Sequence, residues 1–283
     1  TYPTYLGAIG MTYEQAGNGD AGLGILNDEG IELTLVDRIE HHYTTAISTV
    51  ETVAKHRRAL NLNFQAFFED KNRKYQSYVL QGSANKLKAL LRLFNQHEVE
   101  YGFLNQNMSI TGYDYQQQRM TNTNVGKGAL VVPTQQVKGK MLQVWFEPKT
   151  ALQDSLTYDI TAWSLPYAHG LQAVGTKSKI KYNPQKTTFL QQPISSETYA
   201  WGTTYDSFED GKFLAALLKA NIKLRVSKKP FSSADKNWKA GSLFIIRGEN
   251  TTHLSFETTL NRLAKDFQKQ LIPIASGYAS AGP

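Results

Sequence analysis

Glu14 is the residue of this 283-residue chain with the clearest potential for chemistry, because it is a single carboxylate at the end of an apolar segment. The segment Tyr5–Tyr13 (YLGAIGMTY) predicts a buried strand with small residues, and a glycine-rich loop (AGNGDAGLGI) follows. A partly desolvated carboxylate at a strand end suits general-base catalysis, in which it accepts a proton from a reacting group. The alternative is a rim glutamate that pairs with Arg38 or with backbone N–H groups.

Two other motifs have simpler structural explanations. Gly17, Gly19 and Gly22 form a G-x-G-x-x-G pattern, but the helical pattern begins about ten residues after the loop, which favours a flexible turn over a dinucleotide site. Ser83-x-x-Lys86 matches the S-x-x-K spacing of serine acylases, but the companion S-D-N and K-T-G elements are absent from the sequence. Ser83 is instead predicted to be the N-cap of a helix.

Metal and thiol chemistry finds little support in the sequence. The chain has no cysteine, which excludes disulfides, thiolate metal sites and a cysteine nucleophile within it. His97 and Glu100 have the H-x-x-E spacing of a zinc-binding pair, but the pattern puts them where a predicted helix ends and a strand begins, as a solvated helix terminus. We therefore expect no metal or other cofactor to be bound by this chain alone.

The elements that would position Glu14 begin with a long helix. Apolar residues recur at three- and four-residue spacing from Ile31 to about Leu60 and form one stripe. After residue 71 the pattern changes to a strand, a helix, a strand, a polar loop, a buried strand and a helix, and this series occurs twice. The predicted strands are 77–81, 99–104 and 127–133 in the first series, and 198–203, 222–226 and 240–248 in the second.

This alternation of strands and helices predicts the fold class. Strands separated by helical segments are typical of parallel sheets with crossover helices on both faces. The runs ALVV (Ala129–Val132) and LFII (Leu243–Ile246) are apolar over four consecutive residues, as in strands covered on both faces. We expect an α/β fold with a three-layer, mostly parallel sheet and an internal pseudo-duplication. Fold-level analogy places a binding site in the loops at 133–136 and 248–252.

The charge distribution is uneven but indicates no nucleic-acid partner. Residues 1–50 carry seven acids and one base, whereas the remaining residues carry 30 bases and 17 acids. The bases are spread among acids along helices and strands, which is typical of a solvated surface, and no zinc finger, helix-turn-helix or RNP motif accompanies them. No apolar run reaches the ~20 residues that span a bilayer, so no membrane span is expected.

The segment that contains Glu14 resembles a known family. The strand, the glycine-containing loop and the helix ELTLVDRIEHHYTTAISTVE are similar to the C-terminal end of the catalytic domain of carboxypeptidase A-type zinc metallocarboxypeptidases. Thr12, Tyr13 and Glu14 match that family's Thr–aromatic–Glu pattern. The resemblance implies that Glu14 is the general base for a zinc-bound water that hydrolyses a peptide bond.

The resemblance to the catalytic domain covers only the first fifth of the chain. The remaining four-fifths of the chain is expected to have a different role. The family's zinc ligands and its carboxylate-binding arginine lie upstream of the glutamate strand and have no matching positions here. Residues 1–60 would then be the C-terminal strand and helix of a peptidase domain, with the upstream peptidase domain as partner in cis. Residues 61–283 are similar to the C-terminal extension of long bacterial members, a class I glutamine amidotransferase-like α/β domain.

Since the amidotransferase cysteine is missing, the extension is expected to be a non-catalytic accessory domain. The resemblance further implies zinc in the full-length parent, a peptide or protein substrate, and a periplasmic or secreted location. The chain alone would be inactive because it lacks the zinc ligands. The alternative is a stand-alone, non-enzymatic peptide- or glycan-binding α/β module.

Overall fold

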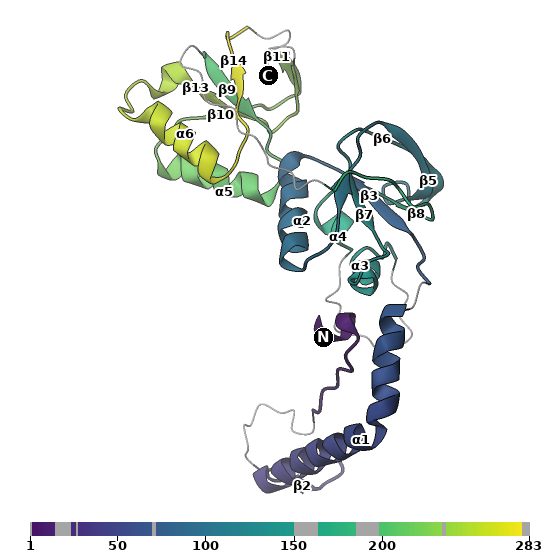
Figure 1. The fold of residues 1–283 in the computed structure, drawn as a ribbon. Coiled ribbons are helices and arrows are strands. Elements are labelled where there is room, and N and C mark those ends of the chain that lie inside the picture. The colour runs from purple at the N-terminus through teal and green to yellow at the C-terminus, as the bar shows by residue number, and fades with distance from the viewer. Residues whose placement is uncertain are drawn as a thin grey trace. The chain divides into compact units, whose positions relative to one another are not determined.

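The protein is a mixed α/β structure whose sheets are antiparallel. A computed structural model describes residues 2–14, 24–26, 28–69, 72–149, 164–184, 198–233 and 236–278 (Figure 1). The chain divides into two compact units: residues 1–74 with 134–144 form the first, and residues 75–133 with 145–283 form the second.

The first unit is dominated by one long helix. It contains η1 (Tyr2–Leu6), the short antiparallel pair β1 (Ile25–Leu26) and β2 (Glu32–Leu33), and α1 (Leu35–Glu69). The predicted helix is confirmed, although it starts four residues later and ends nine residues later than the apolar stripe indicated. Thr34 starts α1, with its backbone N–H and hydroxyl both donating to the Asp37 carboxylate at 2.8 Å and 2.6 Å.

The strand predicted at residues 5–13 is absent. The chain forms η1 there and then continues without regular structure to Glu14, and Ile9 and Met11 are more than half exposed. A strand needs neighbouring strands to pair with its N–H and C=O groups. No described part of the chain supplies such a neighbour to these residues, so the prediction is wrong for the chain as described.

The second unit contains a six-stranded sheet and a four-stranded sheet. The six-stranded sheet has the order β4-β7-β3-β8-β5-β6, and the four-stranded sheet has the order β10-β13-β9-β14. A separate hairpin joins β11 (Phe231–Ser233) to β12 (Lys236–Trp238). The strands of the six-stranded sheet are β3 (Ser77–Gln81), β4 (Gly102–Phe103), β5 (Met108–Asp114), β6 (Arg119–Val125), β7 (Leu130–Pro133) and β8 (Gln172–Thr176).

The strands of the four-stranded sheet and the remaining helices complete the series. The strands are β9 (Ala200–Thr203), β10 (Arg225–Val226), β13 (Leu243–Ile246) and β14 (Ile272–Ile274). The helices are α2 (Ala84–Gln96), α3 (Gly139–Trp145), α4 (Leu165–Ala168), α5 (Phe208–Lys219), η2 (Arg247–Asn250) and α6 (Phe256–Asp266).

Strands β4-β7-β3-β8 of the six-stranded sheet have the same order and the same antiparallel pairing as the four-stranded sheet β10-β13-β9-β14, which corrects the predicted parallel arrangement. Strands β3 and β4, joined through α2, run in the same direction, but β7 lies between them and is antiparallel to both. Likewise β9 and β10, joined through α5, are separated by β13. The two strands of each crossover are therefore separated by a strand that comes later in the chain, β7 in one sheet and β13 in the other. This is the split β-α-β arrangement of ferredoxin-like folds. Strand–helix–strand spacing predicted the crossovers, but it carries no information about whether the two strands are neighbours.

The predicted three layers and single sheet are also wrong. On the four-stranded sheet, Trp201 and Ile245 pack against α5 and α6 on one face. The opposite face, with Ala200, Phe244 and Ile274, is met by Trp238 of the β11–β12 hairpin and by no described helix (Figure 1). The equivalent open face of the six-stranded sheet packs against its own β5–β6 hairpin. The predicted duplication within one sheet is therefore wrong: the two series repeat one order of four strands, but these strands lie in two separate sheets.

None of the described helices, α1 included, combines the length and the apolar character needed to cross a bilayer.

Candidate functional site

Glu14 lies in an exposed segment. Its side chain is exposed, so the described residues do not provide the desolvation that the predicted strand end implied. The preceding Tyr13 is held against the long helix, because its hydroxyl hydrogen-bonds to the hydroxyl of Thr49 on α1. Tyr13, the middle residue of the Thr-Tyr-Glu triplet, is therefore in contact with α1, while Glu14 itself remains accessible.

Helix α1 carries an exposed apolar stripe. Ile39, Tyr43, Ile47 and Val50 follow one another at three- and four-residue spacing, and their exposed fractions are 58%, 68%, 43% and 66%. Within the described part of α1, Arg38 is the only buried residue. Burying an apolar side chain of this size contributes roughly 1.5–3 kcal/mol of favourable free energy. Covering the stripe with another apolar surface would therefore be strongly favourable. The stripe indicates a surface that packs against something else.

The described residues contain no group of three or more His, Asp or Glu side chains arranged to hold a metal ion. His97 is the C-cap residue of α2, and its ring lies edge-on to Trp145 at a centroid distance of 5.1 Å. Glu100 is exposed and precedes β4. The donors described here therefore do not fit a zinc site by themselves. The loop with Gly17, Gly19 and Gly22 lies outside the described residues.

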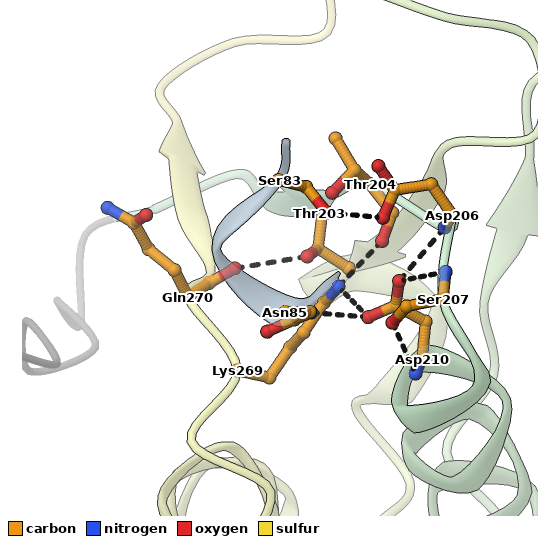
Figure 2. Close-up of polar contacts among 9 residues, drawn as sticks. All are labelled: Ser83, Asn85, Thr203, Thr204, Asp206, Ser207, Asp210, Lys269 and Gln270. Carbon is orange, nitrogen blue, oxygen red and sulfur yellow. Dashed lines mark hydrogen bonds and ion pairs between the residues drawn. The ribbon is translucent and has the colours of Figure 1, made fainter. Parts of the chain in front are cut away.

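A buried polar network in the second unit centres on Asp210 (Figure 2). Its carboxylate accepts hydrogen bonds from the backbone N–H groups of Asp206 and Ser207, both at 2.9 Å, and Ser207 completes a capping box at the start of α5. The other carboxylate oxygen accepts from the Asn85 amide and from the ammonium group of Lys269. Lys269 also donates to the Thr204 carbonyl oxygen at 2.7 Å.

The network is sealed from solvent, which makes it structural. Asp210 and Lys269 have exposed side-chain fractions of 0% and 3%. Burial alone would raise the pKa of Asp210, but the hydrogen bond from Asp206 and the Lys269 ammonium outweigh it and hold that pKa below its usual range. A carboxylate that is ionised, fully hydrogen-bonded and inaccessible has no route to a substrate.

The same network joins the two halves of the second unit. Asn85 belongs to the first turn of α2, and Ser83, just before it, donates from its hydroxyl to the Asp206 carboxylate at 3.0 Å. Ser83 is the N-cap residue, as predicted, but its side chain makes no capping hydrogen bond. Sequence reasoning missed Asp210 and Lys269. The S-x-x-D spacing of Ser207 and Asp210 was a usable signal for the cap, whereas a lone lysine after a helix gave none.

A cavity of about 490 Å³ lies on the helix-free face of the four-stranded sheet. Phe244, Ile246 and Ile274 contribute apolar surface from β13 and β14, and Phe231 does so from the hairpin. The cavity thus sits between the sheet and the β11–β12 hairpin. The predicted loops at 133–136 and 248–252 are not among its lining residues, which corrects that placement: in this topology the open face is the face opposite the helices.

Comparisons of the chain with models of protein families, with curated proteins and with solved structures found no match.

Proposed function

We propose that residues 1–60 complete the catalytic domain of a zinc metallocarboxypeptidase, and that residues 61–283 form a non-catalytic accessory domain. The observation that carries this proposal is the exposed apolar stripe on α1. Contiguous exposed apolar surface on a protein marks interaction sites. The occupant that we propose is the remainder of the peptidase domain, upstream in the same polypeptide, because the segment 5–14 and α1 are the parts that resemble that domain's C-terminal end.

Glu14 would act as the general base of peptide-bond hydrolysis. The accessibility of Glu14 and the hydrogen bond between Tyr13 and Thr49 support this role, since the exposed carboxylate directly follows a residue that contacts the helix with the apolar stripe. There it would accept a proton from the attacking water. Because the described donors do not fit a zinc site, zinc would be held by the upstream part. On the basis of the same family resemblance, we also propose a peptide or protein substrate and a periplasmic or secreted location.

The test is a pair of glutamate substitutions in the full-length protein. Glu14→Gln keeps the shape of the side chain but removes its basicity, so kcat for a C-terminal peptide bond should fall by at least about 10²-fold. The zinc content, measured on the same samples, should stay the same. Glu32→Gln, at an exposed glutamate of β2, is the matched control and should retain full activity. If Glu14→Gln retains a third of the activity, the proposed role is wrong.

A further inference from the structure

The cavity on the four-stranded sheet is a feature of only one of the two topological copies. In the six-stranded sheet, Val79, Val131 and Val174 of the helix-free face pack against Ile110 and Val125 of the long β5–β6 hairpin. The hairpin joins that sheet through β8, so the apolar face is filled. In the other copy the β11–β12 hairpin has only three residues in each strand and forms a sheet of its own. The same apolar face is therefore left partly open.

Aromatic side chains form part of the walls of the cavity. Phe231 of the hairpin meets Phe244 of the sheet at a ring-centroid distance of 5.2 Å. On another side, the Ser233 hydroxyl donates to the Tyr278 carbonyl oxygen at 3.1 Å, which ties the segment after β14 to the hairpin. Tyr199 and Tyr278 complete an aromatic lining. A volume of about 490 Å³ is within the 300–1,000 Å³ typical of small-molecule sites.

The rim of the cavity is cationic. Arg225 and Lys228 both contribute to the lining, and no described Asp or Glu does. Arg225 is largely neutralised, because its guanidinium donates from Nε to a Glu249 carboxylate oxygen at 2.7 Å. No described carboxylate pairs with Lys228, which is exposed. Among the described residues, Lys228 therefore carries a positive charge without a carboxylate partner at the edge of a cavity with apolar and aromatic walls.

We propose that this cavity binds a small aromatic carboxylate. The ring would lie against the contacting pair of Phe231 and Phe244 and over the aliphatic side chains of Ile246 and Ile274, where its burial supplies the affinity. The carboxylate would remain at the rim near Lys228, where the charge selects anions over cations. This inference is independent of the peptidase proposal, because it concerns binding by the second unit and is read out without hydrolysis.

The test compares two probes of opposite charge by isothermal titration calorimetry. The probes are 1-naphthylacetate and 2-(1-naphthyl)ethylamine, which share one ring system. The first should bind with a measurable Kd, and the second should bind at least about tenfold more weakly. Lys228→Gln should weaken the binding of naphthylacetate by about 2- to 5-fold, which corresponds to one solvent-accessible ion pair. Lys229→Gln is the matched control: residue 229 is exposed and does not line the cavity, so its substitution should change nothing.

A second variant tests the apolar part of the site. Phe231→Ala should reduce the affinity for naphthylacetate by at least about tenfold, because the ring loses one of its walls. A thermal melt of the same variant shows whether it folds. If Phe231→Ala does not fold, the proposal is decided by the comparison of the two probes and by the effects of Lys228→Gln and Lys229→Gln. The proposal is overturned if the two probes bind equally, if neither binds at millimolar concentration, or if Lys228→Gln and Lys229→Gln have the same effect.

Discussion

The ammonium group of Lys269 donates to a carboxylate oxygen of Asp210 in the interior of the second unit, 59 residues apart in sequence. The lysine follows α6 and the aspartate lies in the first turn of α5, so one ion pair fixes the ends of both helices that cover the four-stranded sheet. The Asn85 amide brings the start of α2 to the same carboxylate. The Asp210 carboxylate at the start of α5 thus contacts residues at the start of α2 and just after α6.

Lys269→Met is expected to destabilise the protein by about 3–5 kcal/mol, because the Asp210 carboxylate would remain buried without its counter-charge. The measurement is the free energy of unfolding in urea. Arg262→Ala is the control, since Arg262 and Asp266 form an exposed pair at 3.2 Å on α6 and its loss should cost at most ~0.5 kcal/mol. Equal effects of the two substitutions would contradict the importance of the buried pair.

Asp114 is expected to make stability depend on pH in the acid range. Its carboxylate accepts from the backbone N–H groups of Gln116 and Gln117 at 2.9 Å and from the Thr123 hydroxyl at 2.8 Å. Burial acts to raise its pKa, but these hydrogen bonds outweigh it and lower the pKa below its usual value. A lowered folded-state pKa contributes stability that is present above the unfolded-state value of about 3.9 and is lost as pH falls through the folded-state value.

The measurement is the free energy of unfolding at pH 5 and at pH 3. The loss between the two pH values should be smaller in Asp114→Asn than in the wild-type protein, since asparagine does not titrate. Asp266→Asn, at an exposed position on α6, should lose as much as the wild-type protein. A pH dependence that Asp114→Asn leaves unchanged would show that other carboxylates account for it.

Gly202→Ala is expected to destabilise the four-stranded sheet by about 1–3 kcal/mol, because overpacking a buried position forces its neighbours to move. A Cβ at Gly202 would overlap the Trp238 ring, which packs on β9 at this position. The variant should also shift the tryptophan emission, since Trp238 must leave its buried site. Gly248→Ala is the matched control, because a Cβ there meets no atom within 4 Å. An unchanged melting temperature and spectrum in Gly202→Ala would mean that the ring does not lie there.

The elements with a clear apolar pattern could be predicted from sequence, and those with a polar face could not. The runs at Leu130–Val132 and Leu243–Ile246 were recognisable as strands because all but one of their side chains, Ile246, are buried, and this leaves a continuous apolar signal. The β5–β6 hairpin was predicted to be a polar loop. Its strands carry Thr, Asn, Ser and Arg on an exposed face, which hides the alternating pattern. Strand β14 was missed because it has only three residues.

The candidate sites depend on relationships that one sequence does not display. The two strands of each crossover run in the same direction, but an antiparallel strand lies between them, so that neighbouring strands are antiparallel. The sequence does not show this insertion, and the predicted parallel sheet was wrong for this reason. Lys269 can be buried only because the folded chain brings the Asp210 carboxylate next to its ammonium group. The cavity exists because one hairpin is shorter than its topological counterpart, so it became visible only when the two sheets could be compared.

The exposed stripe on α1 is expected to make the chain self-associate when it is studied alone. Ile39 and Val50 are 58% and 66% exposed, and apolar surface of this kind is removed from water wherever a partner is available. Ile39→Glu combined with Val50→Lys should raise the concentration at which dimers appear in sedimentation equilibrium by at least about tenfold.

The same double variant should leave the melting temperature nearly unchanged, because neither side chain is buried in the described chain. Its control is Ser48→Glu combined with Glu51→Lys, at exposed positions of the same helix that are polar in the wild-type protein. A monomeric wild-type chain at millimolar concentration would contradict the prediction. It would also weaken the proposal that the apolar stripe of α1 packs against the rest of a domain. Association that is lost in the double variant but kept in its control would support that proposal.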